Sequence, residues 1–315
     1  MVKVSVIIPN FNHAPYLKKR IDSVLAQSYQ EIEVILLDDR STDNSVNILE
    51  SYRQHPKISH IHYNHQNSKS TFKQWAMGIK LAKGAYIWIA ESDDFCEPFF
   101  LATLISQLEG HPNIGLAYCK SLPVNAEDYI FDDSDQWMKR VHQTRWETDF
   151  INNGSQECVH FLSVQCTIPN VSAVLFKRET LENLELEHIP YLVCGDWFTY
   201  IKILKKYDIA YTALPLNYHR SHSGNVRTKN QHRLLLEQLS VMAYLNSNFK
   251  VSRSKPYNTS VEEKLSFWLA GLRKGQWTVQ ENYQIIRLLM STDRLFPFRL
   301  LKVALLKIMN VKVGF

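Results

Sequence analysis

Acidic side chains gather at the end of one short apolar segment of the chain. Residues 84–90 read Gly-Ala-Tyr-Ile-Trp-Ile-Ala, and a glycine followed by aromatic and β-branched residues predicts a buried strand. Three carboxylates follow it, those of Glu91, Asp93 and Asp94. Carboxylates this crowded repel one another unless a cation or hydrogen-bond donors compensate them. We therefore expect a ligand site here, with an acidic turn in which Asp94 caps a helix over 95–108 as the alternative.

The segments before this one alternate between strand and helix patterns. Strands are predicted over 4–8, 32–37 and 58–63, and helices over 16–27, 46–52 and 70–82. This alternation indicates an α/β fold with a parallel sheet between helices. Asp38 and Asp39 follow the second strand. Right-handed crossovers bring the carboxyl ends of such strands to one edge of the sheet, where ligands bind.

Composition narrows the class of protein. With 315 residues, 45% hydrophobic and 21% charged, the chain can form one large domain or two small ones. A net charge of +5 without a basic cluster argues against nucleic-acid binding. Five cysteines without a CxxC pair indicate reduced thiols in a cytosol. We see no leader pattern and no apolar run of about 18–20 residues, so we expect a soluble or membrane-surface protein. The first predicted strand is not followed by a glycine-rich dinucleotide-binding fingerprint, and the sequence has no phosphate-binding Gly-Lys-Ser/Thr loop. Both observations disfavour a dehydrogenase or P-loop ATPase.

Five segments carry a family resemblance, in order and with the right spacing. They are Val-Ser-Val-Ile-Ile-Pro-Asn-Phe-Asn at 4–12, Ser-Val-Leu-Ala-Gln-Ser-Tyr at 23–29, the stretch 33–45 around Asp38-Asp39, the stretch 82–87, and Glu-Ser-Asp-Asp at 91–94 ahead of Pro98. Together they resemble the family 2 glycosyltransferases, strongly over the first 120 residues and in patches to about residue 230. The resemblance implies a GT-A fold, a Rossmann-like, mostly parallel sheet flanked by helices, here with a C-terminal helical region.

The resemblance also implies a nucleotide pocket. Pro9, Asn12 and Asp39 would line it, with the Asp39 carboxylate accepting a hydrogen bond from N3–H of uracil. Asp38 next door is the alternative, serving a turn. A carboxylate suits that donor because the pairing is charge-assisted.

Glu91-Ser92-Asp93 stands where the family has Asp-X-Asp. Asp93 would bind a divalent cation that bridges the donor's diphosphate, and Glu91 or Ser92 would face the ribose or the waters of the metal. Oxygen ligands and phosphate suit Mg²⁺ or Mn²⁺. Glu91 departs from the family's usual Asp and is one methylene longer, which leaves its contact with the metal open.

Two later segments supply the remaining site residues. Asp196 precedes an expected helix over 197–206, where it is either an N-cap or, by the resemblance, the general base. Arg220 and His222 match the second half of a family Tyr-Arg-X-His segment, with a residue inserted after Tyr218. They would neutralise the leaving diphosphate, and His222 could also bind the metal. A basic surface turn is the alternative.

The resemblance and the patterning together suggest three parts. Residues 1–120 would form the nucleotide-sugar-binding half, 121–232 the acceptor-binding half and 233–315 a helical extension. Acidic residues between 127 and 135 predict a solvated loop. The apolar and basic stretch 294–312 suits a helix that lies on an anionic membrane, packs on the domain or joins two subunits as a homodimer.

These observations favour an inverting, metal-dependent transferase. It would move a hexosyl or N-acetylhexosaminyl group from a nucleotide-diphosphate donor, with UDP favoured, to a hydroxyl of a glycan or glycolipid acceptor. Cell-surface polysaccharide or glycolipid synthesis in the cytoplasm, peripherally at the inner face of the plasma membrane, would fit. The rival is a non-catalytic nucleotide-sugar-binding module on the same fold, which would lack a working base.

Overall fold

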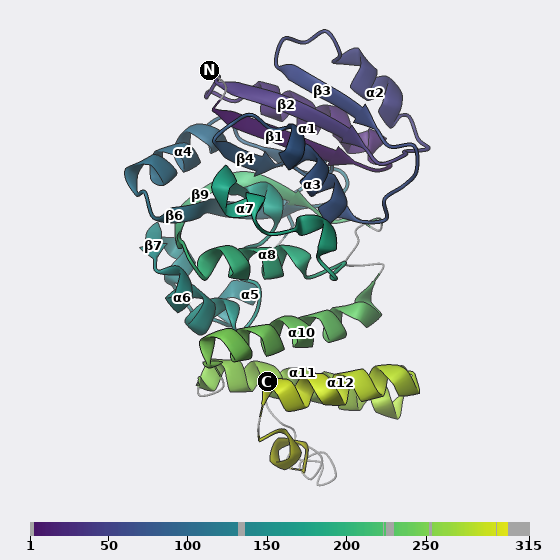
Figure 1. The fold of residues 1–315 in the computed structure, drawn as a ribbon, viewed down its shortest axis with the longest axis vertical. Coiled ribbons are helices and arrows are strands. Elements are labelled where there is room, and N and C mark those ends of the chain that lie inside the picture. The colour runs from purple at the N-terminus through teal and green to yellow at the C-terminus, as the bar shows by residue number, and fades with distance from the viewer. Residues whose placement is uncertain are drawn as a thin grey trace.

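One mixed β-sheet crosses the molecule in this computed structural model (Figure 1). The structure describes residues 3–131, 136–222, 224, 230–251, 254–293 and 295–301. Nine strands pair in the order β3-β2-β1-β4-β8-β6-β9-β5, with β7 beside β9. Their bounds are β1 Val4–Asn10, β2 Ile32–Asp38, β3 Ile58–Tyr63, β4 Tyr86–Ile89, β5 Phe95–Cys96, β6 Ile114–Val124, β7 Phe150–Asn152, β8 Val174–Lys177 and β9 Asp208–Arg220.

The four strands of the N-terminal half run parallel. β1 pairs with β2 and with β4, and its register places Asn10 opposite Asp38 and Ile7 opposite Ile89. The carboxyl ends of these strands therefore meet at one edge, as the alternation of strands and helices predicts. Beyond β4 the sheet adds antiparallel partners, β8 beside β4 and β5 beside β9.

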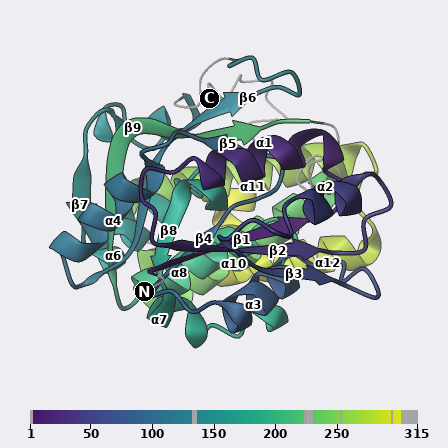
Figure 2. The same cartoon turned by 90° about the horizontal axis from the view of Figure 1, so that it is seen from above.

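Helices cover both faces of this sheet. Their bounds are α1 Ala14–Leu25, α2 Ser45–Ser51, α3 Thr71–Leu81, α4 Phe100–Gly110, α5 Gln136–Lys139, α6 Gly154–Glu157, α7 Arg178–Glu182, α8 Gly195–Leu204, α10 Gln231–Phe249, α11 Lys255–Arg273 and α12 Val279–Thr292. Figure 2 shows α1 and α3 on opposite sides of the strands β1 and β2. The arrangement is an α/β fold with a C-terminal helical region, as expected.

Two apolar cores lie on the two faces because side chains alternate along each strand. On β1, Ile7 belongs to the core that also holds Phe72 of α3 and Trp197 of α8. Its neighbour Ile8 belongs to the core with Leu17 of α1 and Phe100 of α4. Burial on both faces explains why the strand sequences are almost continuously apolar.

The C-terminal helices α10, α11 and α12 pack beneath α8, on the side away from β1 and β2 (Figure 1). None of the helices in the described part of the chain is long and apolar enough to cross a bilayer. Most of the stretch 294–312, for which we predict an interfacial or packing helix, lies outside the described residues.

Three of the alternatives that the sequence left open prove wrong. Asp94 does not cap a helix over 95–108, because residues 95 and 96 form β5 against β9 and α4 starts at Phe100. Asp196 is not an N-cap, because Cys194 holds that position and α8 starts at Gly195. The basic surface turn, the alternative for the segment of Arg220 and His222, does not hold for Arg220, because this residue is buried and ends β9. Stacking of Phe95 on Tyr218, at 4.4 Å between ring centroids, accompanies the β5–β9 pairing that a local pattern could not reveal.

Candidate active site

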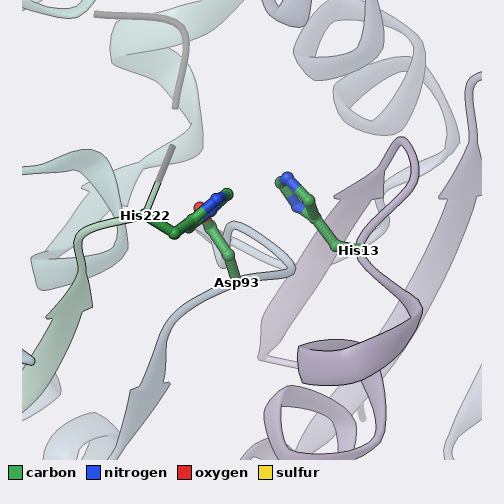
Figure 3. Close-up of side chains that lie close together, drawn as sticks. All are labelled: His13, Asp93 and His222. Carbon is green, nitrogen blue, oxygen red and sulfur yellow. The ribbon is translucent and has the colours of Figure 1, made fainter. Parts of the chain in front are cut away.

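Three side chains from distant segments meet beyond the carboxyl end of β4. Asp93 lies in the turn after β4, His222 follows β9, and His13 lies in the loop between β1 and α1 (Figure 3). His222 Nε2 lies 3.0 Å from Asp93 Oδ2. One potential ligand atom of each of the three residues lies within 4.8 Å of those of the others. Two imidazoles and a carboxylate at this spacing can hold a divalent cation.

The surroundings of Asp93 favour its ionised form. Burial opposes ionisation, but the hydrogen bond with His222 and the nearby His13 ring outweigh it and lower the pKa of Asp93 to about 2. Burial lowers the pKa of His13, which favours its neutral form, although the charge of Asp93 acts in the opposite direction. A neutral imidazole and an ionised carboxylate are the protonation states that metal binding requires.

His13 is held by a residue of the same acidic motif. Its Nδ1 lies 2.8 Å from the hydroxyl oxygen of Ser92. When Nδ1 donates to that oxygen, the lone pair of the imidazole is on Nε2, the arrangement found in metal-binding histidines. Ser92 therefore orients His13, in addition to the ribose or water contact predicted for it. His13 is not among the site residues predicted from the sequence, although its place just after the first strand is a signal.

Glu91 belongs to the same turn but faces another way. Its Oε1 accepts a hydrogen bond of 2.9 Å from Trp75 Nε1 of α3. Burial, together with the charge of Asp93, raises the pKa of Glu91 to about 8. Among the described residues, the possible metal-ligand group consists of His13, Asp93 and His222 and does not include Glu91. Its carboxyl therefore reaches toward α3, and its predicted contact with donor or metal waters stays a prediction.

Asp94 and the buried Arg20 fix the base of the turn. Asp94 accepts hydrogen bonds from Asn170 Nδ2 and from the backbone N–H of Arg220. Arg20 is fully buried, donates from Nε to the carbonyl oxygen of Glu91, and places Nη2 3.9 Å from Asp94. This buried cation offsets part of the repulsion among the carboxylates. Sequence reasoning had no signal for Arg20, which stands in the middle of a helix.

Arg220 is buried and bonded within the protein. Its Nε donates to the carbonyl oxygen of Asp93 at 2.7 Å, and Nη1 donates to the carbonyl of Asn125 at the same distance. Its Nη2 forms an ion pair with Asp128. The predicted contact of Arg220 with a diphosphate would need these bonds to rearrange. Asp128, which we assigned to a solvated acidic loop, instead ties that loop to the site.

The two aspartates after β2 have different partners. Asp38 accepts from Asn10 Nδ2 and from the N–H of Ser41, both at 2.9 Å. Asp39 accepts from Asn64, from the backbone and hydroxyl of Ser68, and from Gln74. Asp38 thus closes the turn after β2, and Asp39 holds the segment between β3 and α3.

The other predicted pocket residues lie beside these aspartates. Pro9 is in β1 opposite Leu37. Asn12 has a positive φ of 56°, and its Oδ1 accepts from the N–H of Thr42 at 2.7 Å. Pro9, Asn12 and Asp39 are therefore brought to the same edge of the sheet as Asp93, but their contact with a nucleotide stays a prediction.

Asp196 lies in the first turn of α8, where its Oδ1 accepts from the N–H of Trp197. The helix start approaches the site through α3. A Cβ on Gly195 would lie 2.2 Å from the Phe72 ring, so only glycine allows this approach. Phe72 packs edge-on against Trp75 at 4.7 Å, and Trp75 bonds to Glu91. This chain of contacts connects the turn carrying Asp196 with Glu91, which stands two residues before Asp93 in the sequence.

A sequence model of glycosyl transferase family 2 matches residues 5–164, just over half of the chain. The chain belongs to glycosyl transferase family 2. Two members of the metal-ligand group, His13 and Asp93, lie inside the matched segment, and His222 lies beyond it. Asp196 lies beyond it.

Relatives of this family 2 chain are found in bacteria. Glycosyltransferase GlyG of Streptococcus pneumoniae is 37% identical over 107 residues, which cover 34% of this chain and 35% of that protein. Chondroitin synthase of Escherichia coli is 28% identical over 135 residues, 42% of this chain and 19% of that protein. The alignments thus span about a third or less of these two relatives.

Solved structures resemble the chain over nearly its whole length. TarS of S. aureus in complex with UDP-GlcNAc superposes with a TM-score of 0.64 at 15% identity, covering 96% of this chain and 89% of TarS. The mannosyltransferase PcManGT of Pyrobaculum calidifontis, in complex with GDP-Man and Mn²⁺, superposes with a TM-score of 0.54 at 14% identity, covering 92% and 85%. At these identities the likeness shows the fold, which is GT-A.

Proposed function

We propose that the protein is an inverting glycosyltransferase that moves a sugar from a UDP donor to a hydroxyl group of a glycan or glycolipid. The observation that carries this proposal is the meeting of His13, Asp93 and His222 beyond β4. They lie at the sheet edge where nucleotides bind in α/β folds, and the proposed base, Asp196, lies in the first turn of α8. Membership of family 2 and the UDP and UDP-GlcNAc complexes of TarS support a UDP-sugar.

The donor atoms of the site suit a divalent cation. His13, Asp93 and His222 would hold it, and the phosphate oxygens of the donor would complete its ligands. Such a cation neutralises charge that develops on a leaving diphosphate. Two imidazoles favour Mn²⁺ over Mg²⁺, which prefers oxygen ligands. The Mn²⁺ in the PcManGT complex agrees with this choice.

The protein's own part in the reaction is to position the acceptor and take its proton. In this proposal the Asp196 carboxylate accepts the proton of the acceptor hydroxyl as its oxygen attacks the anomeric carbon. The attack comes from the face opposite the diphosphate, so the configuration inverts. The bond from the anomeric carbon to the diphosphate oxygen breaks, and its electron pair leaves with the diphosphate. No covalent intermediate with the protein is needed.

A panel of nucleotide sugars tests the proposal. Purified protein is incubated with Mn²⁺, each donor and a set of glycan or glycolipid acceptors, and the released nucleoside diphosphate is measured. Release that depends on both a UDP-sugar and an acceptor is expected. Tight binding of UDP-sugars without any turnover would instead favour the rival, a non-catalytic binding module.

Replacing His13 by alanine is expected to weaken Mn²⁺ binding by at least about 10-fold, since loss of even an indirect metal contact costs about that much. The preference for Mn²⁺ over Mg²⁺ should shrink as well, because the imidazole is what favours the transition metal. Electron paramagnetic resonance of bound Mn²⁺ and calorimetry with Mg²⁺ measure both effects. A His60→Ala variant, on β3 and outside the metal-ligand group, is the control. Equal Mn²⁺ affinity of the two variants would remove His13 from the ligand set.

Replacing Asp39 by alanine is expected to weaken UDP binding by roughly 10- to 100-fold, the usual worth of a charged hydrogen bond. Calorimetry with UDP measures the loss. Because Asp39 is buried and also holds Ser68, a Ser68→Ala variant is the control for a loosened segment. If both variants lose the same affinity, Asp39 acts through the segment, and the base contact lies elsewhere.

The setting of the reaction also remains a proposal. Synthesis of cell-surface polysaccharide or glycolipid at the cytoplasmic face of a membrane fits a chain with a basic, apolar C-terminal stretch. Removing residues 294–312 should then abolish binding to anionic liposomes, measured by co-sedimentation at low and high salt. Retained binding, or loss of folded protein, would favour a helix that packs on the domain or on a second subunit.

A further inference from the structure

A carboxylate of the C-terminal helical region binds the loop that leads into α8. Glu237 lies on α10, where its side chain is buried. Its Oε1 accepts from the N–H of Leu192 at 3.0 Å. Its Oε2 accepts from Val193 at 2.7 Å and from Cys194 at 2.9 Å. Three consecutive backbone donors thus converge on one carboxylate that lies more than forty residues away in the sequence.

Neighbouring contacts hold the same loop from both sides. The hydroxyls of Tyr191 and Ser240 lie 2.9 Å apart, which joins the start of the loop to α10. Phe198 of α8 packs edge-on against Tyr191 at 5.1 Å and against Tyr244 of α10 at 4.9 Å. Figure 1 shows α10 running beside α8. The loop and the start of α8 therefore pack against α10.

The Glu237 carboxylate accepts from the N–H of the N-cap residue Cys194 and of the two loop residues before it. The first N–H groups of a helix and its preceding loop need acceptors, and Ser, Thr, Asp or Asn at the N-cap normally supplies one. Here the N-cap is Cys194, whose sulfur is a weak acceptor. A negative charge at this end also complements the dipole of the ten-residue helix α8.

Asp196 comes just after this loop, and the backbone before it is held by contacts on two sides. On one side Glu237 binds residues 192–194. On the other side Gly195 lies against Phe72, which leads through Trp75 to Glu91. Loss of either set of contacts would let the first turn of α8 shift relative to the metal-ligand group. A shift of about 1 Å in a reacting group can cost roughly 100-fold in rate.

We propose that Glu237 is a positioning residue for the catalytic base, so that the C-terminal helical region is part of the catalytic apparatus. The inference rests on the proposed function, in which Asp196 takes the acceptor's proton. Glu237 acts through the Leu192–Cys194 backbone and touches neither donor nor acceptor. It sets the place of Asp196 and leaves the nucleotide pocket alone.

The test replaces Glu237 by glutamine in the full-length protein. The amide keeps the size of the side chain, but its NH₂ group faces backbone donors that it cannot accept from. We expect acceptor-dependent kcat to fall about 10- to 100-fold, with the KM for the UDP-sugar and the affinity for UDP unchanged. Glu237→Asp, which keeps the charge, should recover part of the rate. If neither Glu237 variant folds, Tyr191→Phe is measured in its place, because it removes the hydroxyl contact between the same loop and Ser240 of α10.

The matched control is Glu281→Gln. Glu281 also accepts from a helix N-terminus with its carboxylate, in the capping box of α12, but on a helix remote from Asp196. Both variants should lose thermal stability, the Glu237 variant more, because its carboxylate is buried and the contacts of Glu281 are exposed. A fall in kcat confined to the Glu237 variant separates positioning from a general loss of stability.

Combining Glu237→Gln with Asp196→Asn completes the test. A residue that acts through Asp196 has nothing left to position once the base is gone, so the double variant should keep the residual rate of Asp196→Asn. A further 10- to 100-fold loss in the double variant, or an unchanged kcat in Glu237→Gln, would overturn the inference. Normal transfer by Asp196→Asn would instead refute the proposed base itself, which distinguishes the two failures.

Discussion

Replacing Asp93 by asparagine is expected to lower sugar transfer by several orders of magnitude. The amide keeps the shape of the side chain but removes the charge that would hold a cation between His13 and His222. Removing the metal from the unmodified protein with EDTA should have a similar effect, reversed by added Mn²⁺. Steady-state release of UDP from the preferred donor measures the rate, and the paramagnetic signal of bound Mn²⁺ measures the site directly.

Asp208→Asn is the control for this variant. Asp208 is a carboxylate at the start of β9 that accepts from Asn113 and from the N–H of Gly154, so its loss tests folding alone. It should leave Mn²⁺ affinity and transfer close to those of the unmodified protein. If transfer survives both EDTA and Asp93→Asn, metal-assisted transfer is refuted.

Much of the fold could be predicted because its first half is locally consistent. The third strand lies at 58–63 as predicted, and α3 starts after Ser70, whose hydroxyl oxygen accepts from the N–H of Lys73. Each of these elements carries its own periodicity and its own end signal. The mixed pairing beyond β4 could not be predicted. It depends on β8, β6 and β9 meeting across long connections, which no local pattern encodes.

Only part of the site could be predicted, because only some of its residues belong to segments with a recognisable sequence pattern. Asp93 and His222 could be paired by family resemblance, and their 3.0 Å separation supports that pairing. His13 could have been found by applying the rule of strand ends to β1, but a single histidine in a loop is a weak signal. Arg220 looked like an available cation in the sequence. Its engagement with Asp128 and with backbone carbonyls depends on a loop that folds back from residues 125–128.

The N-cap alternative for Asp196 is wrong for a physical reason that bears on function. An aspartate before an apolar helix usually caps it, whereas the family resemblance implies that Asp196 is the general base. The acceptor for the loop before α8 comes instead from Glu237. Asp196 lies two residues after the N-cap, in the first turn of α8.

Replacing Asp196 by asparagine is expected to leave folding and donor binding unchanged but to lower acceptor-dependent turnover by roughly 10²–10⁴-fold, the usual worth of a positioned base. Asparagine retains the Oδ1 that accepts from the N–H of Trp197, so the helix start is preserved. Alanine would remove that contact as well and mix two effects. Transfer rates at saturating acceptor, calorimetry with UDP and a thermal melt together measure the outcome.

The slow hydrolysis of the donor by water is the internal reference for Asp196→Asn. It depends on the metal-ligand group and the nucleotide pocket, so it should fall far less than transfer does. Equal losses in hydrolysis and transfer would point to damage at the donor site. Normal transfer by a well-folded variant would rule out this base, and Glu185 and Glu187 would be tested next. Of these, Glu187 is the weaker candidate, because it forms an exposed ion pair with Lys80 that lowers the pKa of its carboxyl.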